Sequence, residues 1–167
     1  MYGPTAAVLR CKGCNRVLER DIIDPEFNLV RQGYDVSVTF DSVIIVSIRF
    51  KQFCELQGYK YLEFFHLAKH PNYYALIVRA PVVAYDIQRR RTRFEKLCHS
   101  CNRYFSVIGS SPVFLVDNAT LGYSFYCSDI AFGSGDAQAQ MILVGPGIQE
   151  EIARQRFRGV HWKAVSE

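Results

Sequence analysis

Four of the six cysteines stand in two short motifs whose spacing suits metal chemistry. The first motif spans residues 11–14 (CKGC) and the second spans residues 98–101 (CHSC). Two thiolates separated by two residues can bind one metal ion from a single tight turn, and two such pairs supply the four sulfurs of a closed tetrahedral zinc site. The sequence therefore predicts one structural Zn²⁺ centre with Cys11, Cys14, Cys98 and Cys101 as its ligands.

An asparagine follows each motif, at positions 15 and 102. The residue after the second cysteine of such a turn often needs a positive φ, which glycine accepts most readily and asparagine accepts better than most other residues. Two alternatives stay open: each pair could act in redox chemistry, or the two motifs could be unrelated. The redox alternative is less favoured because the start of the chain shows no βαβ opening before Cys11.

The composition indicates a globular protein. The chain has 167 residues, of which 49% are hydrophobic and 14% are aromatic. That length suits one domain, or two small halves around a shared core, and the abundance of Phe, Tyr, Val and Ile favours strands. The net charge of +4 is too small to indicate nucleic-acid binding by itself.

The sequence also favours a cytoplasmic location. It does not open with the pattern of a secretory signal peptide, and its apolar runs are far too short to cross a membrane. Because four of the six cysteines lie in metal motifs, metal binding in a reducing compartment is favoured over a disulfide framework. We therefore expect a cytoplasmic protein without a membrane partner.

The hydrophobic pattern of the first half alternates between strands and one helix. Residues 36–40 alternate with period two, as a half-buried strand does. A strand over 42–46, a helix over 49–57 and a strand over 61–67 follow. The helix places Phe50, Phe53 and Cys54 on one face, so Cys54 is interpreted as a core thiol.

A similar unit stands 98 residues further along, with a strand over 141–144, a helix over 147–156 and a strand over 160–165. Each unit lies downstream of one CxxC-Asn motif. We therefore predict an internal duplication, with pseudo-repeats at about 1–70 and 94–167 related by a pseudo-twofold axis near the metal. The alternative is two unrelated strand–helix–strand units in a mixed fold.

A β-rich middle segment, residues 71–93, separates the predicted pseudo-repeats. Strands are expected over 73–78 and 82–85, and a hairpin over 94–107 carries the second cysteine motif. Further strands are expected over 112–116 and 123–126, followed by a flexible glycine-containing loop over 132–139. The predicted fold class is therefore α+β and strand-rich, with residues 1–167 forming a single domain.

The order of three segments resembles the double-CXXCG motif proteins, a bacterial family that includes immunity proteins against toxins delivered between neighbouring cells. The matching segments are 9–14 (LRCKGC), 97–101 (LCHSC) and the closing unit from Met141 to Trp162. Asn15 and Asn102 stand where that family carries glycine. The resemblance implies a metal-stabilised scaffold that binds and neutralises a cognate toxin, and it implies no catalytic residues.

Residues 89–93 (RRRTR) form the densest positive stretch of the chain. Their position shortly before Cys98 predicts that they lie near the metal-binding hairpin. They could contact an acidic protein surface or a nucleic-acid backbone, or they could simply keep a solvated edge strand from aggregating. We interpret Arg89, Arg90, Arg91 and Arg93 as a surface for the toxin, with a zinc-ribbon nucleic-acid-binding module as the alternative function.

The sequence contains no residue pattern typical of an enzyme. A Ser-His-Asp motif, a phosphate-binding loop and a pair of catalytic acids are all lacking, so no enzymatic activity is expected. His66 and His70 have a spacing that binds metal on a helix, but their place at a strand end argues against a second metal site. His99 is expected to be exposed, and His161 is expected to pack beside Trp162.

Overall fold

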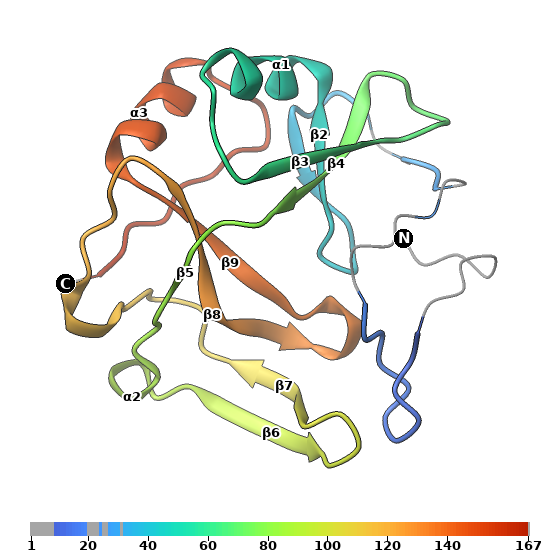
Figure 1. Ribbon diagram of the computed structural model, residues 1–167, viewed down its shortest axis with the longest axis vertical. Coiled ribbons are helices and arrows are strands. Elements are labelled where there is room, and N and C mark those ends of the chain that lie inside the picture. Colours follow the sequence, from blue (N-terminus) through green and yellow to red (C-terminus); the bar gives the residue numbers. More distant parts are fainter. Residues whose placement is uncertain (1–8, 20–23, 25–26, 31, 167) are drawn as a thin grey trace.

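The computed structural model describes residues 9–19, 24, 27–30 and 32–166. This part of the chain is an α+β structure with two β-sheets and three α-helices (Figure 1). In chain order the elements are β1 (Val36–Val38), β2 (Ile44–Ser47), α1 (Ile48–Leu56), β3 (Leu62–His66), β4 (Tyr73–Val78), β5 (Val82–Val83), α2 (Ile87–Arg90), β6 (Arg93–Cys98), β7 (Arg103–Ile108), η1 (Val116–Asn118), β8 (Phe125–Ser134), η2 (Gly135–Ala137), β9 (Ala139–Val144) and α3 (Pro146–Arg154), where η marks a 3₁₀ helix.

The first sheet is antiparallel and has the strand order β1-β2-β4-β3. Its central strand β2 is apolar on both faces, as a strand covered on both sides must be. Val46 points into the main core, while Ile45 belongs to a smaller cluster with Val43, Leu67 and Ala75. Both faces of this sheet are therefore closed to water around β2.

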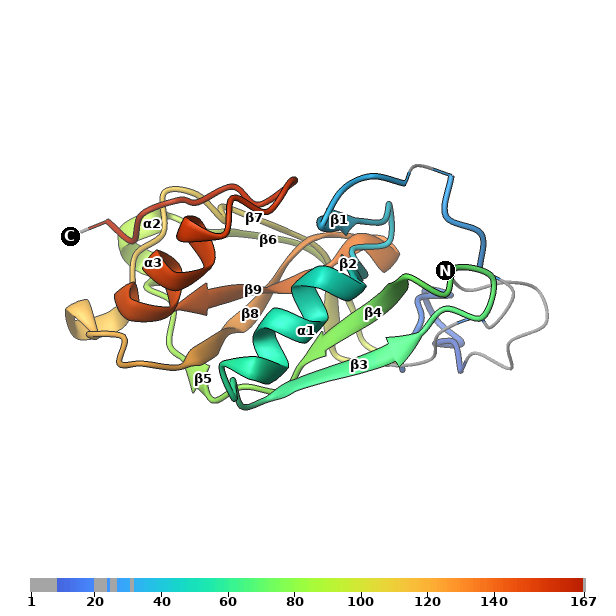
Figure 2. The ribbon, with the colours of Figure 1, turned by 90° about the horizontal axis from the view of Figure 1, so that it is seen from above.

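The second sheet is organised around the ten-residue strand β8, and its order is β5-β8-β7-β6 with β9 also paired to β8. The first part of β8 pairs with β5, and its last residues pair with β7. Strand β9 runs along the other side of β8 (Figure 2). Because β6 pairs with β7 alone among the described strands, the β6–β7 hairpin forms one edge of this sheet.

The helices α1 and α3 share the main core at one end of the molecule (Figure 1). Helix α1 begins at the cap Ser47, whose side chain accepts a hydrogen bond from the Phe50 amide, and α3 begins at a proline, which suits the first helical turn. Burial in this core raises the pKa of the Cys54 thiol to about 12, as expected for an inert core cysteine. None of the described helices has the length and apolar composition that a membrane crossing requires.

The first predicted strand–helix–strand unit is confirmed as β2-α1-β3, whereas the second is only partly correct. Strand β9 and helix α3 form as predicted, but residues 160–165 do not form a strand. After Gly159 this segment makes one isolated bridge, between Val165 and Val113, and Trp162 is 41% exposed. A segment with an alternating pattern forms a strand only where a neighbouring strand edge can hydrogen-bond to it, and residues 160–165 have no continuous edge beside them.

Two further expectations about loops and strands are wrong. Residues 112–116 do not form a strand, since they make only isolated bridges before η1 begins at Val116. Residues 132–139 are not a flexible loop, because β8 continues to Ser134 and β9 begins at Ala139. Gly133 and Gly135 have φ values of +114° and +54°, so these glycines mark a tight connection between two paired strands.

Replacement of Gly159 by alanine should destabilise the fold strongly. An added Cβ would overlap with the Val36 carbonyl oxygen, at a φ of +91°. Gly58 is the matched control, because its φ is +66° but no atom would lie within 4 Å of an added Cβ. In urea unfolding, Gly58→Ala should cost about 1–2 kcal/mol and Gly159→Ala about 3 kcal/mol or more. Equal losses would contradict the close approach of residue 159 to β1.

Candidate metal centre

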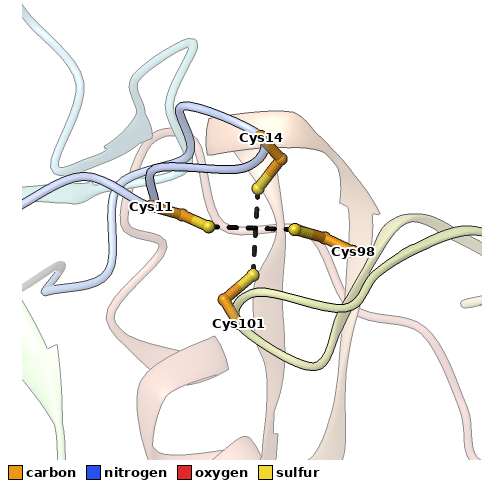
Figure 3. A group of neighbouring side chains, drawn as sticks. All are labelled: Cys11, Cys14, Cys98 and Cys101. Carbon is orange, nitrogen blue, oxygen red and sulfur yellow. Dashed lines mark hydrogen bonds between the residues drawn. The ribbon is translucent and has the colours of Figure 1, made fainter.

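The four cysteine sulfurs converge on one point between the two motifs (Figure 3). The Sγ atoms of Cys11 and Cys98 are 3.8 Å apart, those of Cys14 and Cys101 are also 3.8 Å apart, and all four lie within 4.8 Å of one another. A tetrahedron with metal–sulfur bonds of about 2.3 Å has edges of about 3.8 Å. All four cysteines are free rather than joined in disulfides. The group therefore fits a tetrahedral metal ion.

Both motifs adopt the tight turn that the sequence predicts. Asn15 and Asn102 have φ values of +58° and +52°, which confirms the expected left-handed backbone after each second cysteine. In the first motif, the Cys11 amide donates to the Arg16 carbonyl and the Asn15 amide donates to the Cys11 carbonyl, each at 2.8 Å. The second motif forms the turn between β6 and β7.

Backbone amides prepare the first cysteine of each motif to be a thiolate, which is the form that binds metal. The amides of Cys101 and Ser100 lower the pKa of Cys98 to about 6. The amides of Cys14 and Gly13 lower the pKa of Cys11 in the same way.

The second cysteine of each motif is shifted in the opposite direction. Burial, together with the neighbouring thiols, raises the pKa of Cys101 to about 11. For Cys14 the Arg16 amide acts to lower the pKa, but burial and the sulfurs of Cys98 and Cys11 leave it raised. Because metal ligands must be deprotonated, a metal ion binding here would displace protons from this second pair.

The two motifs touch at Gly13 and Ser100, which hold the same position within their turns. A Cβ added to Gly13 would overlap with the Ser100 side chain and would lie 3.2 Å from the Cys98 sulfur. The lack of a side chain at residue 13 is therefore what lets the turns approach closely enough for their sulfurs to meet.

Polar contacts dock the first motif on the second sheet. Asp136 in η2 accepts a hydrogen bond from the Val17 amide at 2.9 Å and pairs with Arg10 at 3.2 Å. The Arg16 guanidinium donates to the Gln138 side chain and to the Phe105 carbonyl, each at 2.9 Å. No sequence pattern indicates this role for Asp136, Arg16 and Gln138, and only their proximity in the folded chain reveals it.

The arginine-rich stretch adjoins the metal-binding hairpin, as expected, but it lies at the end of β6 away from the metal centre. Strand β6 runs from Arg93 to Cys98, which puts the stretch and the second motif at opposite ends of the strand. Arg89 and Arg90 belong to the short helix α2 rather than to an edge strand. The Arg89 guanidinium lies 4.5 Å from the centre of the Phe114 ring, and Arg90 donates to the Ser111 carbonyl.

None of the four histidines belongs to the cluster of cysteine sulfurs. His99 is exposed, as predicted, and His161 and Trp162 are also exposed, so the expected packing of His161 is wrong. His66 ends β3 with its ring against Tyr74. His70 is buried, and its Nε2 accepts a hydrogen bond from the Leu29 amide at 2.8 Å.

Cys127 is a buried thiol outside the metal centre. Its sulfur donates to the Val78 carbonyl at 3.6 Å, and burial raises its pKa. A raised pKa lowers the share of reactive thiolate. The environment of Cys127 is therefore that of a core residue.

Comparison of the chain with protein-family models, with curated proteins and with solved structures gave no match in any of the three. The resemblance to double-CXXCG proteins therefore rests on the motifs of the sequence itself.

Gly13→Ala should weaken metal binding by about tenfold or more, since the new methyl group would push the two turns apart. The double variant Gly13→Ala/Ser100→Gly should recover most of the affinity, because it removes the side chain that the methyl group meets. Competition with a chromogenic zinc chelator measures both affinities. An unchanged affinity in Gly13→Ala, or no recovery in the double variant, would contradict the contact between the turns.

Proposed function

We propose that this protein is a non-enzymatic binding protein whose scaffold is held closed by a structural zinc ion. The observation that carries the proposal is the convergence of the Cys11, Cys14, Cys98 and Cys101 sulfurs, which all lie within 4.8 Å of one another. Four thiolates fill the coordination shell of Zn²⁺ and leave no position for a substrate, which is the pattern of structural rather than catalytic zinc. When bound, the ion supplies a cross-link between chain segments 87 residues apart.

The choice of zinc follows from the donor set. Tetrahedral sites made only of thiolates take zinc or iron. Zinc has no redox chemistry, which suits a site whose proposed role is to hold two segments together. Binding of zinc to such sites is worth about 10–16 kcal/mol at neutral pH.

Internal duplication is the second part of the proposal. Helices α1 and α3 have the same length of nine residues, and their bounds differ by 98 positions at both ends. Phe50 and Cys54 of α1 and their counterparts Ile148 and Ile152 of α3 are all buried in one core. The Sγ atoms of the two pairs of matching cysteines, Cys11 with Cys98 and Cys14 with Cys101, are separated by the same distance of 3.8 Å. On this proposal the second copy has lost its last strand.

The partner we propose is a bacterial toxin, and the protein acts as its immunity protein in the cytoplasm. Support comes from the order of motifs that resembles the double-CXXCG proteins, together with a closed metal site that suits a scaffold. Within the arginine-rich stretch, the exposed Arg91 and Arg93 are the better candidates for an acidic toxin surface. Arg89 and Arg90 already contact Phe114 and Ser111.

Cys98→Ser should lose both zinc and protection against the toxin, because three thiolates no longer close the site. Metal content, measured by mass spectrometry of the purified protein, should fall from about one zinc per chain to a small fraction. Cys127→Ser is the matched control, because that thiol lies in the core outside the centre, and it should keep its zinc. Protection by Cys98→Ser at the wild-type level would contradict the role of the metal.

The double variant Arg91→Glu/Arg93→Glu should weaken binding to the toxin encoded by a neighbouring gene by about tenfold or more, with zinc content unchanged. Arg154→Glu, a charge reversal on the exposed end of α3, serves as the control and should bind normally. Surface plasmon resonance measures the affinities. Salt-dependent binding of single-stranded or duplex DNA, without toxin binding, would instead support the nucleic-acid alternative.

A further inference from the structure

Arg16 is a cation buried without a carboxylate partner. The residue is 6% exposed, and its guanidinium donates to two neutral acceptors, the Gln138 side-chain oxygen and the Phe105 carbonyl. Its Nε atom is buried and has no hydrogen-bond partner. Burying a charge is costly unless an opposite charge compensates for it.

The carboxylate of Asp136, which contacts the first motif, does not form an ion pair with Arg16. Asp136 contacts the neighbouring Val17 amide, but its ion pair is with Arg10. Among the residues that the structure describes, no carboxylate lies within ion-pair distance of Arg16. Among the described residues, a counter-charge for Arg16 therefore has to come from a group other than a paired carboxylate.

A zinc ion held by four thiolates would carry a net charge of about −2 at the turn to which the Arg16 backbone belongs. Arg16 follows Cys14 by two positions, and its backbone amide acts directly on the Cys14 sulfur. We propose that the Arg16 guanidinium is the internal counter-charge of the zinc–thiolate centre. As a positioning residue, it couples zinc binding to the docking of the first motif on β7 and on the β8–β9 connection. This inference rests on the proposed structural zinc.

The coupling follows from where the two ends of Arg16 are anchored. Its backbone belongs to the turn that presents Cys11 and Cys14, whereas its guanidinium is held by Phe105 in β7 and by Gln138 just before β9. Gln138 is itself fixed, since its amide nitrogen donates to the carbonyls of Tyr104 and Gly133, each at 3.2 Å. With zinc bound, burial of Arg16 is electrostatically compensated and the docked arrangement is favoured. Loss of zinc removes most of that compensation.

The chain provides its own matched control in Arg103. Both motifs continue with Asn-Arg, so Arg103 occupies in the second motif the position of Arg16 in the first. The Arg103 amide acts on the Cys101 sulfur as the Arg16 amide acts on Cys14. The Arg103 side chain, however, is exposed, whereas Arg16 is only 6% exposed. Solvent therefore compensates the charge of Arg103, and the removal of this charge should leave zinc binding unaffected.

The test compares the zinc affinities of wild type, Arg16→Gln, Arg16→Lys and Arg103→Gln by chelator competition. Arg16→Gln removes the charge and should weaken zinc binding by about 10–100-fold. Arg16→Lys keeps the charge but loses the forked hydrogen bonds, so its affinity should fall between those of wild type and Arg16→Gln. Arg103→Gln should bind zinc within about twofold of wild type.

Hydrogen exchange supplies a second measurement, because a role of Arg16 in packing alone would not change the effect of zinc on amide exchange. Zinc should slow amide exchange in residues 9–19 of the wild type, and saturating zinc should do so much less in Arg16→Gln. Equal zinc affinities for Arg16→Gln and Arg103→Gln would overturn the inference and leave the structural zinc in place. So would a loss of thermal stability in Arg16→Gln that is the same with and without zinc. A wild-type protein that binds no zinc would instead overturn the proposed function.

Discussion

The close approach of the four cysteine sulfurs is the contact on which the proposed function of this structure depends. It joins a short N-terminal turn to the tip of the β6–β7 hairpin, across 87 positions of the chain. Apart from this contact, the described part of the first motif is held mainly by hydrogen bonds and by the buried side chain of Val17. Each such hydrogen bond contributes about 1 kcal/mol, an order of magnitude less than a zinc ion bound by four cysteines. A zinc ion bound as proposed would therefore be the dominant constraint on this segment.

The main core has a different origin and does not include the metal motifs. Its buried residues come from α1, α3, β2, β4 and β8, together with Ala80 and Phe157. The Phe157 ring lies 5.0 Å from that of Phe50 and 5.4 Å from that of Phe53, so the end of α3 is tied to α1 by aromatic packing. Loss of metal should consequently release the first motif and the hairpin tip before it reaches this core. On this proposal the molecule separates a conventional hydrophobic interior from an edge that depends on the metal.

Local spacing predicted the parts of the structure that are encoded locally. The four cysteines and the asparagine after each pair indicated the turns and their backbone conformation, and the apolar faces of the two helices predicted which residues are buried. The failures concern long-range pairing. Residues 160–165 have the pattern of a strand, but the fold offers no continuous edge to pair with them. The contacts of Arg16 and Val17 with Gln138 and Asp136 join residues 122 and 119 positions apart, and no periodicity indicates them.

The most direct test of the central claim is X-ray absorption spectroscopy at the zinc edge on the purified protein, which reports the atoms bound to the metal and their distances. The account predicts a single shell of about four sulfur neighbours at about 2.3 Å. A shell containing nitrogen or oxygen ligands, or protein that carries no zinc while its four cysteines are joined in disulfides, would contradict it.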